Sequence, residues 1–91
     1  MSKRWKLVID RQPQKAMRRL PRPARQRIDE AILNLADDPR PPGCRPVKAA
    51  AKGTYRVRVG DYRVIYIVLD DEQVIIVVRI ARRGESTYKG L

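Results

Sequence analysis

The sequence predicts an α+β domain with the element order β-α-α-β-β-β, in which two N-terminal helices pack on one face of an antiparallel sheet. Alternating apolar and polar residues over 54–60, 61–70 and 73–83 are typical of strands. Apolar residues at helical spacing lie ahead of those strands, in the first half of the chain. With 91 residues, the chain is long enough for one compact domain at 1–91 and too short for two.

The first element is a strand, "RWKLVID", at residues 4–10. Its apolar side chains Trp5, Leu7 and Ile9 alternate with Arg4 and Lys6. Alternation of this kind gives a strand one apolar face. We expect that face to lie on the core.

Two helices follow the first strand. The segment "PQKAMRRL" at 13–20 predicts a short helix that Pro21 ends. A longer helix is expected from Pro23, which suits a first-turn position, until Pro39 at the latest. Its apolar residues recur at i, i+3, i+4 and i+7 and make one face: Ile28, Ala31, Ile32 and Leu35.

The middle of the chain predicts irregular structure. Four of the seven prolines fall in "PRPPGCRP" at 39–46, which indicates a loop. The next segment, "VKAAAKG" at 47–53, is interpreted as a loop or an irregular approach to the following strand. It brings two basic residues, Lys48 and Lys52, close to that strand.

The turn at 60–61 fixes the pairing of the strands on either side of it. With Gly and Asp as the two loop residues, Arg58 lies opposite Arg63, and Arg56 lies opposite Ile65. The three arginines then share one face, where directly opposed like charges destabilise a pair by roughly 0.2–1 kcal/mol.

The same counting extends to the last strand. An acidic loop at 70–73 places Ile65 opposite Val78 and Arg63 opposite Ile80. Arg82 then falls two residues further along, on the side of the three arginines. A slip of one residue in this pairing would turn Arg82 to the opposite face.

The charge of the chain indicates the kind of partner. Lys and Arg number 21 against 10 Asp and Glu, which gives a net charge of +11. An excess of this size favours a polyanionic partner, either nucleic acid or a nucleoprotein such as the ribosome. The main alternative is an acidic protein, and the two are compatible.

The composition also excludes several classes of chemistry. The chain has no histidine, so His-based acid–base catalysis, a Ser-His triad and a His metal site are ruled out. No glycine-rich phosphate loop is present, and we expect neither a metal nor a cofactor. The single Cys44 cannot form an internal disulfide. With no apolar run that could span a membrane and no secretory signal at the start, we expect a cytoplasmic protein.

The arginines suggest a phosphate site. Guanidinium groups of Arg56, Arg58, Arg63 and Arg82 at one end of a sheet can grip phosphate oxygens in a bidentate way. The alternative is that they are ordinary solvated strand positions. Tyr88, shortly after these strands, can fold back to stack on a base or exchange a proton, or it can pack for stability alone.

Two segments resemble the RelE toxins of the RelE/ParE superfamily: "GTYRVRVGDYRVIYIV" and "VIIVVRIARRGESTY". The front half agrees, with "KRWKLVID", a helical pair and a Pro-rich loop before the sheet. The resemblance covers nearly the whole chain, and the Arg-Arg-to-Tyr ending is closer to RelE than to ParE. It implies the RelE-like, microbial ribonuclease-type fold.

The resemblance implies the toxin of a type II toxin–antitoxin system. Such a toxin is an endoribonuclease that cuts messenger RNA in the ribosomal A site without a metal and so inhibits translation. A ribose 2′-OH attacks the adjacent phosphate and leaves a 2′,3′-cyclic phosphate and a 5′-OH. The implied partners are the ribosome, its messenger RNA and an acidic, RelB-like antitoxin that folds on binding.

The resemblance also implies roles for individual residues. Arg63 matches the catalytic arginine, Tyr88 matches the tyrosine that stacks on or activates the nucleotide, and Arg82 or Arg83 matches a late catalytic arginine, with Arg82 preferred. The expected contacts to RNA or ribosome are Arg56, Arg58, Lys48 and Lys52.

One departure from the family concerns the general base. Relatives carry lysines at the positions of Arg56 and Arg58, and arginine is a poor base because it stays protonated. Tyr88, Lys48 or Lys52 would then take that role. Two other functions stay open: a ParE-like inhibitor of DNA gyrase, and a nucleic-acid-binding module without catalysis.

Overall fold

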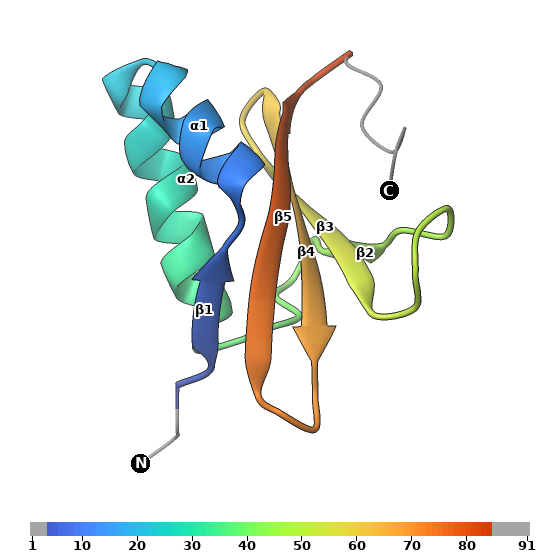
Figure 1. Ribbon diagram of the computed structural model, residues 1–91. Coiled ribbons are helices and arrows are strands. Elements are labelled where there is room, and N and C mark those ends of the chain that lie inside the picture. The colour runs from blue at the N-terminus through green and yellow to red at the C-terminus, as the bar shows by residue number, and fades with distance from the viewer. Residues whose placement is uncertain (1–3, 85–91) are drawn as a thin grey trace.

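The computed structural model describes residues 4–84, which form two helices and a five-stranded sheet (Figure 1). The elements in chain order are β1 (Lys6–Ile9), α1 (Arg11–Arg19), α2 (Arg22–Leu35), β2 (Arg45–Pro46), β3 (Thr54–Val59), β4 (Tyr62–Leu69) and β5 (Val74–Arg82). The predicted α+β class and the order of the main elements are confirmed.

Local side chains explain where the helices begin and end. Asp10 caps α1, because its carboxylate accepts a hydrogen bond from the backbone N–H of Arg11 at 2.8 Å. The chain leaves the helical conformation at Leu20, just before Pro21. α2 then starts with Pro23 in its first turn, as the sequence predicted.

The sheet has the strand order β1-β5-β4-β3-β2, and one pairing corrects the prediction of a wholly antiparallel sheet. β1 runs parallel to β5, with Lys6 beside Val74 and Ile9 beside Val77. The connection between them is long, as a parallel pair requires, and contains both helices and the strands β2, β3 and β4. Alternation in the sequence identifies a strand but carries no information about the direction of its neighbour.

A second correction is β2, which the sequence placed inside a loop. Arg45 pairs with Arg56, and Pro46 pairs with Tyr55. β2 occupies an edge of the sheet, which is where a strand can contain proline.

The core lies between the helices and one face of the sheet. Both helices lie on the same side of it (Figure 1). The predicted apolar face of β1 packs against this core through Trp5, Leu7 and Ile9. The buried residues of the core are Ile28, Ile32, Leu35, Val64, Tyr66, Val68, Ile75, Val77 and Ile80.

The β3–β4 hairpin has the predicted register. Arg58 lies opposite Arg63, and Arg56 lies opposite Ile65. The turn depends on Gly60, whose φ of +60° matches the first central position of a type II′ turn. The face of the hairpin that carries these arginines is turned away from the helices.

The β4–β5 pairing departs from the prediction halfway along. Ile67 pairs with Ile76 as expected, but the register shifts between Ile65 and Tyr66. Beyond this β-bulge, Ile65 lies opposite Arg79, and Tyr62 lies opposite Arg82. The bulge therefore turns Arg82 to the helix side of the sheet and Arg79 to the opposite side.

Candidate nucleic-acid interface

The face of the sheet away from the helices carries five arginines, which we call the arginine face. Its members come from four different strands, and the cross-strand pairing places them on one side: Arg45, Arg56, Arg58, Arg63 and Arg79. Strands β3, β4 and β5 contain no acidic residue at all. The arrangement is a positive surface built on four paired strands.

The register sorts these arginines into two neighbouring rows. One row crosses the sheet through Arg45, Arg56, Ile65 and Arg79. The other row contains Arg58 and Arg63, whose Cα atoms are about 5 Å apart as direct cross-strand partners. Adjacent strands lie about 4.8 Å apart, so both rows fit within the reach of a short stretch of RNA backbone.

Part of the arginine face is hollow. A depression of about 300 Å³ is lined by Gly43 and the side chains of Arg45, Arg56 and Arg58. Gly43 has a φ of +92°, a backbone conformation that favours glycine, and the space beside its Cα atom is open. A pocket with three guanidinium groups and no carboxylate is suited to a phosphate group.

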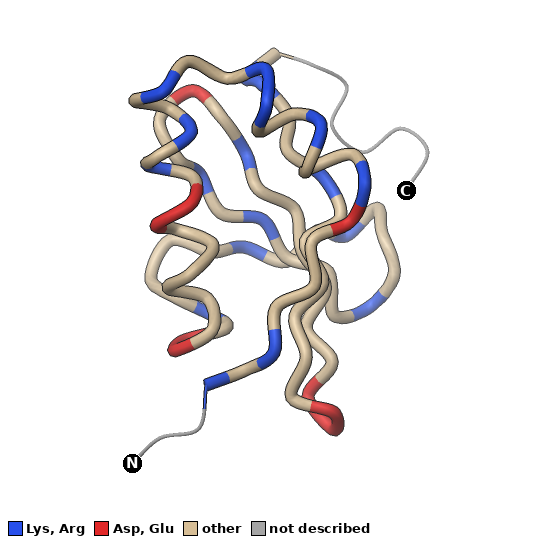
Figure 2. The backbone as a smooth tube through the Cα atoms, turned by 60° about the vertical axis from the view of Figure 1, so that its left-hand side comes forward, with Lys and Arg blue, Asp and Glu red and all other residues tan. Residues whose placement is uncertain are grey.

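Neutralising partners for these charges are absent among residues 4–84. The two ion pairs of that part of the chain lie elsewhere and join Arg4 to Asp37 and Arg40 to Asp70. Figure 2 shows acidic positions at the β3–β4 turn (Asp61), at the β4–β5 turn and in the helical half, while the charged positions within the three long strands are basic.

Loop residues 39–45 reach the arginine face because Arg40 anchors them. Its guanidinium donates to both carboxylate oxygens of Asp70, at 3.2 and 2.8 Å, and to the hydroxyl of Tyr55 at 3.1 Å. The hydrogen bonds from Arg40 lower the pKa of Asp70. Arg40 also lies 5.2 Å from the centre of the Tyr55 ring.

A buried tyrosine, Tyr66, also holds this loop in place through its hydroxyl group. The hydroxyl of Tyr66 donates to the carbonyl oxygen of Pro39 at 2.8 Å, and burial raises its pKa. Its ring stacks on that of Tyr55, with centroids 6.1 Å apart. Together these contacts position Gly43 and Arg45 beside β3.

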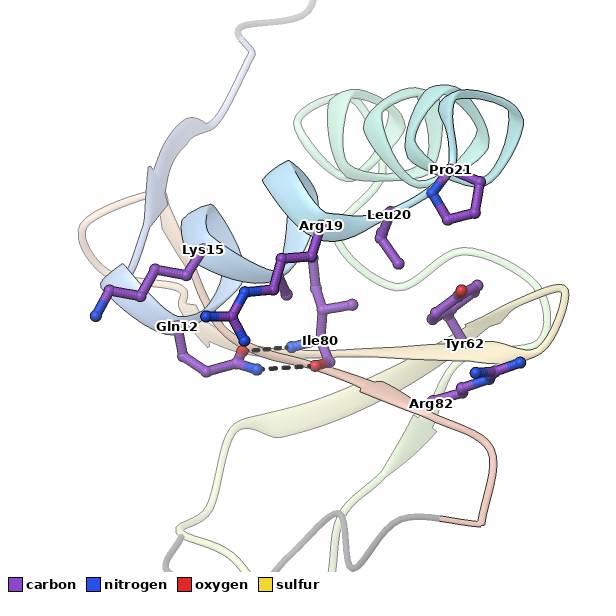
Figure 3. A pocket seen from close by; sticks show the side chains of 9 residues that line it. Gln12, Lys15, Arg19, Leu20, Pro21, Tyr62, Ile80 and Arg82 are labelled. Atoms are coloured by element: carbon purple, nitrogen blue, oxygen red, sulfur yellow. Dashed lines mark hydrogen bonds between the residues drawn. The ribbon is translucent and has the colours of Figure 1, made fainter.

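Arg82, the preferred late arginine, lies on the other side of the sheet from Arg63. It lines a cleft of about 500 Å³ beneath α1, together with Lys15, Arg19 and Tyr62. Figure 3 shows Arg82 beside Tyr62 at one end of this cleft and Lys15 at the other. The prediction that Arg82 joins the arginine face was wrong, because it assumed a β5 without a bulge.

Arg83 is better placed than Arg82. Its backbone N–H donates to the carbonyl oxygen of Asp61 at 2.6 Å, which continues the pairing of β5 with the start of β4. Successive side chains of an extended chain alternate between faces, so Arg83 is the member of this pair that adjoins the arginine face. Tyr88 lies outside the described residues.

Lys48 and Lys52 do not join the arginine face. Both are exposed in the loop between β2 and β3, at the opposite end of β3 from the turn at Gly60. At about 3.3 Å per residue, Lys52 lies roughly 20 Å along the chain from Arg58.

The sequence analysis missed two members of the arginine face, Arg45 and Arg79. Arg45 fell in a proline-rich segment, where no pattern indicated a strand. Arg79 was not considered, because the regular pairing assumed for the last strand placed Val78, and not Arg79, opposite Ile65. A possible signal is the run of apolar residues before Arg79, since a strand that is apolar on both faces tolerates a bulge.

Within residues 4–84, no group of three or more Cys, Asp or Glu side chains is arranged to hold a metal ion. In the same part of the chain, neither helix has the length and apolar character needed to cross a membrane.

Comparison with known proteins agrees with this geometry. Residues 7–87 match the model of the family described as the ParE toxin of the type II toxin–antitoxin system parDE. A protein of Methanocaldococcus jannaschii named RelE1 toxin is 35% identical over 89 residues, which is 94% of this chain and 97% of the relative.

Solved structures share the fold over almost the full length. RelE in the RelE–RelB complex of Pyrococcus horikoshii is 30% identical with a TM-score of 0.79, covering 90% of this chain and 98% of that one. The isolated RelE toxin of E. coli is 21% identical with a TM-score of 0.74, covering 90% and 87%, and shows likeness of fold. The chain belongs to the RelE/ParE superfamily of toxins from type II toxin–antitoxin systems.

Proposed function

We propose that this toxin is an endoribonuclease that cuts messenger RNA in the ribosomal A site and so inhibits translation in the cytoplasm. The observation that carries this proposal is the arginine face, where Arg58 and Arg63 are direct cross-strand partners with no acidic residue on the neighbouring strands. A charge cluster that costs stability and has no partner within the described residues is suited to an RNA backbone.

The proposed reaction needs charge stabilisation above all. When a ribose 2′-OH attacks the adjacent phosphate, negative charge accumulates on the phosphate oxygens, and fixed guanidinium groups stabilise it. Arg63, the direct cross-strand partner of Arg58, is assigned to the scissile phosphate. Arg56 and Arg58 position the RNA, and Arg83 approaches from the end of β5.

Proton transfer needs a further group, because arginine stays protonated. We assign the general base to Tyr88 rather than to Lys48 or Lys52, since the two lysines lie at the far end of β3. Their separation along β3 from Arg58 and Arg63 favours a role of the two lysines in contacts to the ribosome. Removing the Tyr88 hydroxyl is then expected to reduce cleavage more than RNA binding.

An antitoxin is the second proposed partner. The family is defined by toxin–antitoxin pairs, and relatives have been solved as RelE–RelB complexes. The net charge of +11 favours an acidic, RelB-like antitoxin that folds on the toxin.

Primer extension on a defined messenger in a purified translation system tests the ribonuclease. Wild type should cut within codons and only on translated message. Arg63→Ala should cut roughly 10²–10³ times more slowly, the loss typical of removing one transition-state charge partner. Arg25→Ala, an exposed arginine of α2, is the matched control and should cut normally.

The family model that matches is named for ParE, which favours gyrase inhibition as the second candidate. Folded wild type that leaves translated messenger intact would overturn the ribonuclease. Supercoiling by purified gyrase is then the assay to run, and inhibition there would establish the ParE-like function. Salt-dependent RNA binding with neither activity would leave a binding module.

A further inference from the structure

We propose that Arg79 is a phosphate-binding residue of the RNA site, delivered to that site by the β-bulge between β4 and β5. This inference rests on the proposed ribonuclease function. Its occupant is the sugar–phosphate backbone of the messenger, at or next to the phosphate that Arg63 holds.

The position of Arg79 on the arginine face is set by the bulge. The register shift between Ile65 and Tyr66 makes Arg79, rather than Val78, the cross-strand partner of Ile65. Arg63 pairs with Ala81, two residues further along β5, so Arg79 is a diagonal neighbour of Arg63 at about 7–8 Å. Without the bulge, Arg79 would point toward the helices.

Arg63 is therefore flanked by a guanidinium on each side. Arg58 lies opposite it on β3, and Arg79 lies diagonally on β5. The direct partner of Arg63 on β5 is Ala81, which is small, buried and uncharged, so Arg79 is the basic residue of β5 nearest to Arg63 on this face. A phosphate held by Arg63 can then be reached from both neighbouring strands.

One nitrogen of the partly buried Arg79 side chain has an unusual environment. Its Nε atom is shielded from solvent, yet it has no hydrogen-bond partner among the residues that the structure describes. Leaving a donor of a charged group unpaired in a buried position costs free energy, and native structures normally satisfy such donors. A phosphate oxygen would provide the missing acceptor.

A structural role explains these observations less well. The neighbouring Ile65 is fully buried, so the aliphatic stem of Arg79 has an apolar surface to cover. That packing would be served equally by a Met or Leu, which would not bury an unpaired donor. Packing alone therefore does not explain why a charged guanidinium group is present at position 79, whereas binding of an anionic ligand does.

Binding of RNA to three proteins tests the proposal: wild type, Arg79→Gln and the control Arg25→Gln. The probe is a short 2′-O-methyl oligoribonucleotide, which cannot be cleaved by 2′-OH attack. Arg79→Gln should bind severalfold more weakly and reduce the slope of log K against log salt by roughly 0.7–1. Arg25→Gln should keep the wild-type slope, and Arg79→Gln should melt no lower than wild type.

Cleavage provides the second readout. Arg79→Gln should slow ribosome-dependent cleavage about tenfold or more, and Arg79→Lys should restore the salt slope but only part of the rate, because lysine is not bidentate. Wild-type affinity and salt slope in Arg79→Gln would overturn the proposal. If Arg63→Ala still abolished cleavage in that case, the ribonuclease function would stand without Arg79.

A measurement on the unmodified protein covers the case in which Arg79→Gln does not fold. Phenylglyoxal modifies accessible arginines, and mass spectrometry identifies each one. The oligoribonucleotide should slow modification of Arg79 severalfold and leave Arg25 unaffected. An equal rate at Arg79 with and without RNA would contradict the proposal, whereas protection without any cleavage by wild type would support it and overturn only the ribonuclease.

Discussion

Arg58 and Arg63 face each other across the β3–β4 hairpin, where the sheet would be more stable with one of them replaced. The opposite face of the same hairpin is apolar and packs against the core. The repulsion between the two arginines is therefore confined to the face of the sheet away from the helices, where a bound anion can neutralise their charge. This is the pattern expected when binding, rather than folding, selects a residue.

Replacing one arginine of the pair should stabilise the protein. Arg58→Thr removes the repulsion and introduces a residue that suits strands, so the free energy of unfolding should rise by about 0.2–1 kcal/mol. Urea unfolding measures it. Arg56→Thr, which removes the like-charge pair with Arg45, should give a similar gain, and equal stability of all three proteins would show that repulsion does not destabilise the sheet.

Tyr66 should make the protein sensitive to alkali. Burial raises its pKa above the ordinary value of 10, so the unfolded chain loses this proton before the folded one does. Stability contributed by the protonated hydroxyl is complete below pH 10 and falls as the pH rises toward the raised pKa. Unfolding by urea at a series of pH values measures this slope.

Tyr66→Phe separates the titration from the packing. It should lose about 1 kcal/mol at neutral pH, because Pro39 loses a hydrogen-bond donor, and its stability should depend less on pH above 10. An unchanged alkaline slope would assign the sensitivity to another group.

At the scale of elements, Gln12 joins α1 to β5. Its side-chain amide donates to the carbonyl oxygen of Ile80 at 3.0 Å and accepts from the N–H of Ile80 at 2.9 Å (Figure 3). The parallel pairing with β1 stops at Val77, so this amide takes the place of a further strand residue. The backbone N–H and carbonyl groups of Ile80, the residue after Arg79, thereby have hydrogen-bond partners at this edge of β5.

Gln12→Glu tests this connection with little change of shape. A carboxylate can accept from the N–H of Ile80 but repels its carbonyl oxygen, so the free energy of unfolding should fall by about 1–3 kcal/mol. Chemical denaturation gives the value. Gln26→Glu is the matched control at an exposed position of α2, and it should change stability little.

Elements with one apolar face were predictable, and elements without one were not. β1, the helices and the β3–β4 hairpin follow from spacing, and Gly60 fixed the register that brings Arg56, Arg58 and Arg63 together. β5 is apolar on both faces, so alternation could not locate its bulge. Three of the five arginines of the arginine face were therefore predictable, while Arg45 and Arg79 depended on tertiary pairing.

At the scale of the whole molecule, the charge of +11 opposes folding through self-repulsion. Added salt screens exposed charges, so the melting temperature should rise between low salt and 0.15 M. Phosphate should raise it more than chloride at equal ionic strength, because phosphate also binds the arginine face of the folded state. Thermal unfolding followed by circular dichroism measures both effects.

The control for specific binding is Arg63→Gln with Arg56→Gln. This double variant should respond equally to phosphate and chloride while keeping the general effect of salt. If the wild type also showed no difference between the two anions, binding of phosphate at the arginine face would be contradicted, and the salt response would reflect screening alone.

The parallel pairing of the first strand with the last has a consequence for biosynthesis. Within the described residues β1 pairs with no strand other than β5, and contacts such as that of Gln12 with Ile80 span 68 residues. An emerging chain cannot close its sheet until the last strand has left the exit tunnel, since domains fold as units. A nascent toxin is thus unable to assemble its complete arginine face until Arg79 and the rest of β5 have left the tunnel of the machine that it is proposed to attack.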